Sequence, residues 1–169
     1  MALHATARSS WAERRLMAHI EGLTLTGSPT ISGADDPARS ASSGPWVRLT
    51  FDEATHTPAG RFSATQSARE LRLLVTADIF WPAPETRAPA SDNLQGAQDI
   101  ADELREALMF LALDFYDYTT PASPVTVADC VINVQRVDPI RRLPDDDGFR
   151  RRQIRAYADW IGRFDDYFA

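Results

Sequence analysis

The residues that could act as metal ligands or nucleophiles are few and scattered. The three histidines, His4, His19 and His56, stand on different predicted elements and form no HxxH or HxxxH pair, so their spacing does not indicate a zinc site. The single cysteine, Cys130, allows no internal disulfide. Its in-phase neighbour Ile132 predicts a buried, inert thiol rather than a nucleophile. These residue types and spacings predict no metal centre and no covalent catalysis.

The acidic residues and glycines also lack a pattern that identifies a reaction. The run Asp145–Gly148 has neither the alternating ligands nor the distant glutamate of a calcium-binding loop, so it predicts a solvated turn. The eight glycines form no G-x-G-x-x-G and no P-loop, which argues against a phosphate-binding loop. Asp78, His56 and Asp159 remain as ungrouped candidates for an enzyme. We expect no cofactor.

One basic cluster brackets the aspartate turn. Its members are Arg136, Arg141, Arg142, Arg150, Arg151, Arg152 and Arg155. Such a cluster suits a ring of arginines that faces a subunit or a nucleic-acid channel. It also suits a charge-mixed hairpin surface, and the neighbouring aspartates favour this second interpretation. The net charge of -6 argues against a general nucleic-acid binder.

The bulk composition indicates one globular domain. Hydrophobic residues make up 44% of the 169 residues, which suffices for a core and is too much for a disordered chain. We expect a single domain over 1–169, with its core at 10–164 and a tail at 165–169. No apolar run approaches the ~18 residues that span a membrane. The N-terminus lacks the apolar core of a secretory signal, so we expect no membrane association and synthesis in a cytoplasm.

Two helices are predicted from apolar residues at spacings of three and four. The first covers Ser10–Leu23 and opens with a capping box formed by Ser10 and Glu13. The second covers Asn93–Leu111 and carries the stronger apolar stripe. Both stripes are expected to pack on a sheet.

Strands are predicted where apolar and polar residues alternate. They lie at Trp46–Phe51, Glu70–Trp81 and Asp129–Asp138. Phe149–Phe164 fits the helical and the strand period about equally; the turn before it and the need for a strand partner favour a strand.

Three connections, Leu25–Gly44, Asp52–Ala68 and Pro82–Ser91, are predicted to be long loops, the first with a possible short edge strand. The order helix, strand, strand, helix, strand, strand predicts an α+β domain. Its sheet would be four-stranded and mostly antiparallel, with two main helices packed on one face.

Several phrases of the sequence match a known pattern. They are the first strand Trp46–Phe51, the second strand ending in Ile79-Phe-Trp-Pro82, the helical phrase Ala97–Leu104 and the closing strand Arg152–Trp160. In this order, over Ser10–Phe164, the chain resembles the tail terminator (tail-completion, minor tail U-like) proteins of long-tailed bacteriophages.

The resemblance implies a structural virion protein rather than an enzyme. Members of that family look like small subunits that form a hexameric ring on the tail tube, stop its polymerisation and present the surface for head–tail joining. The implied partners are further copies of the chain, the tail-tube protein and the head–tail connector protein. DNA would only pass through the lumen. The implied location is the tail–head junction of the virion, after assembly in the bacterial cytoplasm.

The same resemblance directs attention to arginines and aromatic residues as contacts. A subunit or tail-tube interface is expected to involve Trp46, Arg48, His56, Arg61, Phe62, Arg72 and Arg87. Arg150, Arg151 and Arg152 are expected to face the lumen or a partner. The alternative interpretation is a cytoplasmic ligand-binding or regulatory α+β domain that dimerises through its sheet.

Overall fold

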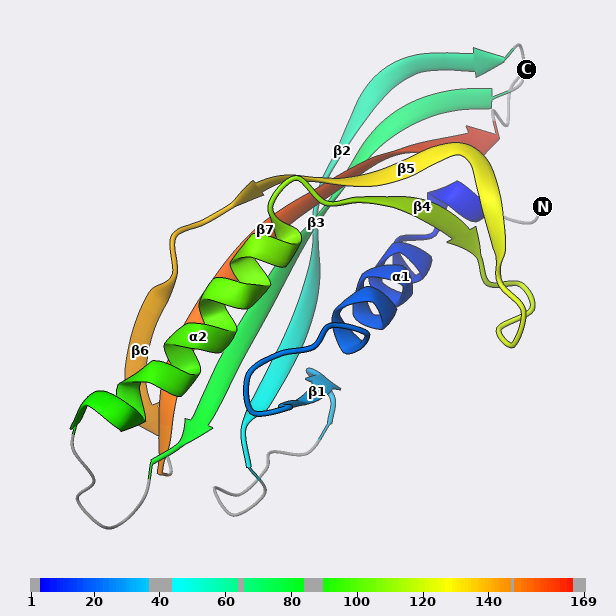
Figure 1. Ribbon diagram of the computed structural model, residues 1–169. Coiled ribbons are helices and arrows are strands. Elements are labelled where there is room, and N and C mark those ends of the chain that lie inside the picture. Colours follow the sequence, from blue (N-terminus) through cyan, green and yellow to red (C-terminus); the bar gives the residue numbers. More distant parts are fainter. Residues whose placement is uncertain (1–3, 37–43, 64–65, 84–89, 147, 166–169) are drawn as a thin grey trace.

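The computed structural model describes residues 4–36, 44–63, 66–83, 90–146 and 148–165, although the side chains of 54–56, 62, 90–94, 146 and 165 lie outside the described part. One twisted sheet carries two α-helices on a single face (Figure 1). The elements are η1 (Ala5–Ala7), α1 (Ser9–Glu21), β1 (Thr30–Gly33), β2 (Trp46–Ser63), β3 (Gln66–Pro82), α2 (Ala90–Leu108), β4 (Ala112–Asp117), β5 (Val125–Val137), β6 (Arg141–Asp146) and β7 (Phe149–Asp165).

Over the described residues, the sheet has seven strands in the order β1-β2-β3-β7-β5-β4, and β6 pairs with β7 beside β5. Every pairing is antiparallel except that of β1 with β2. The chain is therefore mostly β, with a mixed sheet, and the predicted α+β fold with a four-stranded sheet is wrong.

The largest error concerns the predicted loop Asp52–Ala68. Residues 52–63 continue β2, and 66–68 belong to β3. Register shifts between Glu53 and Thr55, Pro58 and Gly60, and Arg61 and Ser63 interrupt the strand. Each shift changes the face to which later side chains point, so the alternation on which strand prediction depends is lost.

Further strands lie in segments that we expected to be loops. β1 forms within the predicted loop Leu25–Gly44, for which a short edge strand was one of the alternatives. β4 follows α2 directly, and β6 forms in the predicted turn Pro139–Gly148. Pro144 is compatible with β6 because that strand lies at an edge. The preference for a strand at Phe149–Phe164 is confirmed by β7.

The two predicted helices form, with shifted ends. α1 begins at Ser9, and its N-cap Arg8 makes no side-chain capping bond, so the predicted capping box is wrong. α2 ends at Leu108 because Phe110 adopts a positive φ of 60° that terminates the helix.

The core lies between the helices and the inner face of the sheet. Alternating residues of the three central strands reach it, as Leu73, Ala77 and Ile154 do, and the stripe of α2 packs on them. The largest fully buried side chains are Trp160, Phe115, Leu16, Ile20, Leu49, Leu71, Leu73, Ile79, Ile100, Leu104, Leu108 and Ile132. Burial of each such side chain contributes about 1.5–3 kcal/mol before the loss of conformational entropy is subtracted.

Three strands continue beyond the two α-helices as an arm, formed by 57–63 of β2, 66–70 of β3 and 161–165 of β7 (Figure 1). η1 fastens the last of these strands to the core. The Trp160 indole N–H donates to the Thr6 carbonyl at 2.8 Å, and the Arg163 backbone N–H donates to the Thr6 hydroxyl at 2.8 Å. Gly162 permits this approach, because a Cβ there would lie 2.8 Å from the Thr6 carbonyl oxygen.

Candidate functional site

The residues first considered for chemistry do not converge. Among the described residues, no group of three or more His, Cys, Asp or Glu side chains is placed to hold a metal ion. His4 accepts the Thr6 N–H and caps η1. Burial, with the nearby Arg15, lowers the pKa of His19 on α1. The side chain of His56 lies outside the described part.

Cys130 is buried, as its position in an alternating strand predicts. Burial raises the pKa of its thiol to about 11, so the thiol stays protonated at neutral pH. Its Sγ–H donates weakly to the Ile161 carbonyl at 3.6 Å.

The outer face of the sheet, which faces away from both α-helices, begins with an aromatic cluster. Trp46 stacks on Phe80 with ring centroids 4.4 Å apart, and Phe149 meets Phe80 edge-on at 5.7 Å. The Trp46 indole N–H donates to the Ser32 hydroxyl. The guanidinium of Arg151 lies 5.0 Å from the Phe80 ring. Trp46 was expected at an interface, but only 2% of it is exposed.

Ion pairs cross the strands further along the outer face. Arg48 lies 3.6 Å from the Asp78 carboxylate, which also accepts a hydrogen bond from Gln153 at 2.9 Å. Arg72 donates two bonds to Asp159, at 2.6 and 2.8 Å, and so joins β3 to β7. Both carboxylates once considered for catalysis are therefore occupied in cross-strand pairs. Arg48 and Arg72, both expected at an interface, bind within their own sheet.

The three consecutive arginines of β7 do not share a surface. Strand alternation places Arg151 on the outer face and turns its neighbours to the other side. Arg152 is buried and donates to the Gln98 side chain of α2 at 2.9 Å. Burial, followed by the nearby Arg142, lowers its pKa. Arg150 forms an ion pair with Asp145 of β6.

The remaining expected contacts lie on the arm or outside the described residues. Arg61 is exposed on the arm. His56 and Phe62 belong to β2, but their side chains are not described. Arg87 falls in 84–89, outside the described residues.

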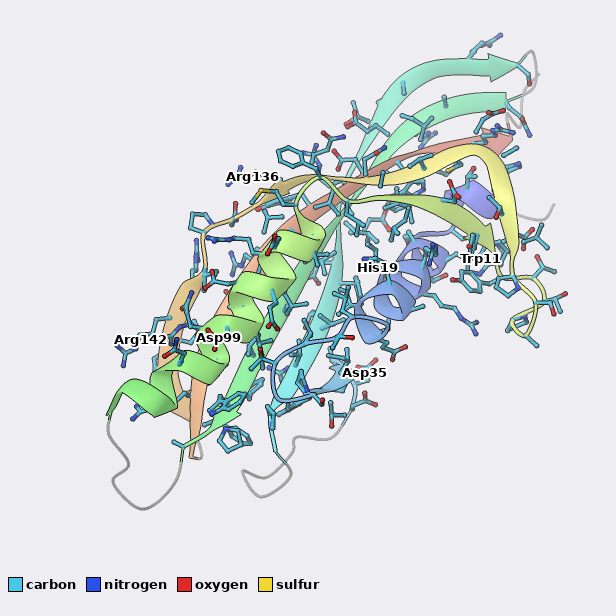
Figure 2. The ribbon with its side chains drawn as sticks, viewed as in Figure 1. Trp11, His19, Asp35, Asp99, Arg136 and Arg142 are labelled. Carbon is cyan, nitrogen blue, oxygen red and sulfur yellow. The ribbon has the colours of Figure 1, made fainter. Side chains whose placement is uncertain are left out.

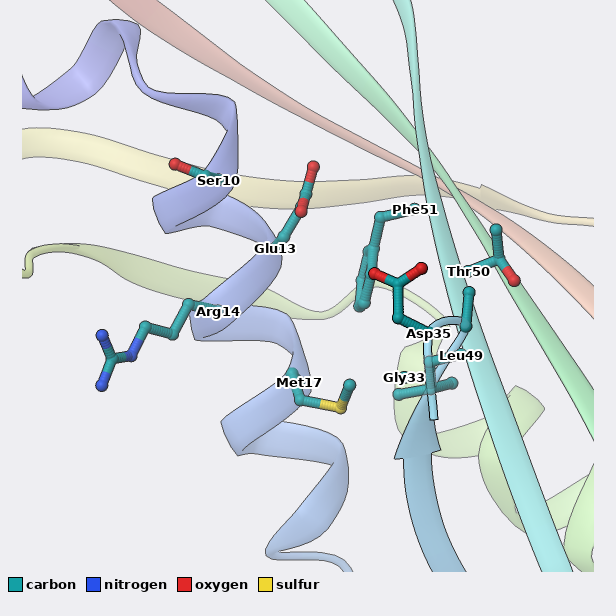
Figure 3. Close-up of a pocket in the computed structure, with 10 residues that line it drawn as sticks. Ser10, Glu13, Arg14, Met17, Gly33, Asp35, Leu49, Thr50 and Phe51 are labelled. Carbon is teal, nitrogen blue, oxygen red and sulfur yellow. The ribbon is translucent and has the colours of Figure 1, made fainter. Parts of the chain in front are cut away.

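A groove of about 470 Å³, which no sequence pattern predicted, lies between α1 and the β1–β2 edge (Figure 3). Its lining residues are Ser10, Glu13, Arg14, Met17, Gly33, Ala34, Asp35, Leu49, Thr50 and Phe51. Burial, together with the charges of Glu53 and Asp52, raises the pKa of Glu13. Arg14 points away from the groove, with its guanidinium 4.7 Å from the Tyr118 ring. We call this site the acidic groove. It combines residues from three distant segments, so no local pattern reveals it.

The sequence also did not reveal an apolar knob, which we define as Met109 and Phe110 at the end of α2. Phe110 is 86% exposed and Met109 45%. Together with Val134, Gln135, Arg136 and Val137 of β5, the two knob residues line a hollow of about 230 Å³. Both knob residues belong to the apolar run Ala107–Leu111, which reads as the end of a buried helical stripe.

Comparisons with known proteins leave the family open. No protein family model matches the chain, and no curated protein matches it. One solved structure is similar over 90% of this chain and 92% of its own, with 15% sequence identity and a TM-score of 0.41, a likeness too weak to support an argument. Within the described residues, no helix is long and apolar enough to cross a membrane.

Proposed function

We propose that this chain is a structural subunit that forms a ring on the tail tube of a long-tailed bacteriophage. The ring ends tube polymerisation and presents the surface for head–tail joining. The observation that carries the proposal is the arm, because three paired strands extend beyond the helix-covered core. The sequence resemblance to tail terminator proteins supplies the identity of the assembly.

The arm is suited to contact another protein through its side chains rather than by adding a strand. β1 pairs with β2 only from Trp46 to Leu49, so the free edge of β2 continues into the arm. Three register shifts and Pro58 interrupt that edge. Such features oppose open-ended strand pairing between molecules. We assign the arm, including the exposed Arg61, to the contact with the tail tube.

The contacts of three residues considered for catalysis agree with a structural role. The carboxylates of Asp78 and Asp159 and the thiol of Cys130 all bond within the chain. The net charge of -6 would let DNA pass through a ring without adhering.

One observation favours the alternative, a ligand-binding or regulatory domain. The acidic groove, at about 470 Å³, falls within the roughly 300–1,000 Å³ of small-molecule sites. Its acids would select a cationic compound. Saturable binding of such a compound to the free chain, without any assembly, would favour this second function.

A polymerisation assay tests the proposed function. Tail-tube protein from the same genome is assembled with and without this chain, and tube lengths are measured by negative-stain microscopy. We expect the chain to shorten the tubes and to be found at one end. Arg61→Glu on the arm should weaken this capping, whereas Arg142→Glu on the exposed edge strand β6 serves as the matched control. Tubes of unchanged length with wild-type chain would contradict the proposal.

A further inference from the structure

The knob and the acidic groove lie at opposite edges of one sheet. The knob borders β5, on the side of the sheet that ends in β4, whereas the groove borders β2, where β1 ends. Figure 2 shows Arg136 beside the end of α2 and Asp35 beside β1, well apart. Because the two sites lie apart in the folded chain (Figure 2), the knob of one molecule can reach only the groove of another.

The backbone holds the knob in an unfavourable conformation. Phe110 occupies the position after the end of α2 with a φ of 60°, where glycine is usual because a side chain is strained there. The strain is not offset by burial, since the ring is 86% exposed. A large apolar side chain that is both strained and exposed suggests that its burial occurs in a complex.

The rim of the knob carries one exposed cation. Arg136 is the charged residue that lines the neighbouring hollow, and 69% of its side chain is exposed. It bonds Asp138 at 2.7 Å and lies 5.2 Å from the Tyr157 ring. These contacts fix the direction of the guanidinium while leaving most of it accessible.

The acidic groove has the complementary properties. Met17, Leu49 and Phe51 provide an apolar lining between α1 and β2 (Figure 3). Glu13 and Asp35 supply negative charge beside that lining. The raised pKa of Glu13 reflects burial and the nearby acids Glu53 and Asp52, so a cation arriving there would relieve repulsion.

We propose that Met109 and Phe110 of one copy insert into the acidic groove of the next copy, with Arg136 facing Glu13 and Asp35. An aromatic anchor in an apolar site with a charged rim is a common arrangement at the centre of protein interfaces. A contact between two different surfaces of the same chain is head-to-tail and repeats until the rotation closes a ring. The inference rests on the proposed function, because that function identifies the occupant of the groove as a second copy of the chain.

Two variants with complementary defects test this contact. Phe110→Gly removes the aromatic ring of the knob and keeps the groove. Glu13→Arg/Asp35→Arg reverses the charge of the groove and keeps the knob. Each variant alone should be monomeric, with the association weakened at least about 30-fold. Mixed together, they should form a two-chain species and nothing larger, because only one productive pair of surfaces remains. Native mass spectrometry with one variant isotopically labelled identifies that species.

The controls separate assembly from folding. Phe110→Gly relieves the positive φ and removes no buried contact within the chain, so its thermal midpoint should equal or exceed that of the wild type at a concentration low enough to keep the wild type monomeric. Val125→Ser changes another exposed apolar residue, at the start of β5, and should leave assembly unchanged. Rings formed by Phe110→Gly, or a mixture that gives no two-chain species, would overturn the inference.

The outcomes also separate this inference from the proposed function. If the Phe110→Gly variant still forms rings that cap tubes, the proposed contact is refuted and the proposed function is retained. If ring formation requires Phe110 but the wild-type rings cap no tube, the proposed function is refuted and the contact is retained. A wild-type chain that remains monomeric at all concentrations would refute both.

Discussion

At the residue scale, the arginines of the outer face bind groups of their own chain. Arg72 forms two bonds to the nearly buried carboxylate of Asp159, and Arg48 pairs with Asp78. The sequence shows arginines spaced along strands, but it does not show which carboxylate lies across the sheet. The resemblance and residue type therefore suggested an interface for Arg48 and Arg72, whereas the strand register assigns both to pairs within the sheet.

The state of Cys130 gives a first prediction. Burial raises the pKa of the thiol to about 11, so almost no thiolate forms at neutral pH, and the sulfur is enclosed. Iodoacetamide should therefore leave Cys130 unmodified in the native chain and modify it fully in urea, as mass spectrometry would show. Rapid modification of the folded chain would contradict the buried position.

Glu13 gives a second prediction, which concerns pH. Its pKa is raised above 4.5 in the folded chain, first by burial and then by Glu53 and Asp52. The folded state therefore binds this proton more tightly than the unfolded state does. The resulting stabilisation is present below pH 4.5 and is lost as the pH rises through the raised pKa.

Glu13→Gln should accordingly raise the thermal midpoint at pH 7 and leave it unchanged near pH 4. The measurement is made in the Phe110→Gly background, so that ring assembly does not contribute. Glu106→Gln on the exposed face of α2 controls for the loss of one negative charge. A lower midpoint for Glu13→Gln at pH 7 would show that the ionised carboxylate stabilises the fold instead.

At the element scale, the sequence predicted strands well where one face is fully buried. Leu71, Leu73 and Ile79 alternate because every second residue of β3 meets the core. At β7 the period fitted helix and strand about equally, and the preceding turn and the need for a strand partner favoured the strand. The arm part of β2 is mostly exposed, and register shifts break its phase. Its polar residues therefore resemble a loop. The four-stranded sheet followed from leaving out the short strands β1, β4 and β6.

The knob and the groove were beyond sequence reasoning for a different reason. Phe110 lies in an apolar run that resembles the buried end of α2 until its positive φ turns it outward. The groove depends on α1, the end of β1 and the middle of β2, which meet only through the parallel pairing of β1 with β2. That pairing requires the fold itself, because no short pattern encodes it.

The attachment of η1 to β7 gives a third prediction. A Cβ at Gly162 would lie 2.7 Å from a Leu71 methyl and 2.8 Å from the Thr6 carbonyl oxygen. Gly162→Ala should therefore displace η1 and lower the free energy of unfolding by about 1–3 kcal/mol, as expected for overpacking. Urea denaturation in the Phe110→Gly background measures the change.

Gly22→Ala is the matched control, because a Cβ there meets only backbone oxygens at 3.4 Å or more. It should be neutral or slightly stabilising. Equal stability of the two alanine variants would mean that η1 does not pack tightly on β7.

At the scale of the whole molecule, three surfaces have separate proposed roles. The knob and the acidic groove join neighbouring copies from opposite edges of the sheet, and the arm reaches the tail tube. This division predicts that Arg61→Glu forms normal rings that fail to cap tubes, whereas Phe110→Gly forms no rings at all.

The most direct test of the central claim is the assembly state of the purified wild-type chain. Native mass spectrometry across a concentration series, combined with negative-stain microscopy, measures both the number of subunits and the symmetry. We predict one closed ring, hexameric as the resemblance implies, with a central opening. A strict monomer, or a two-fold dimer that never closes into a ring, would contradict the account.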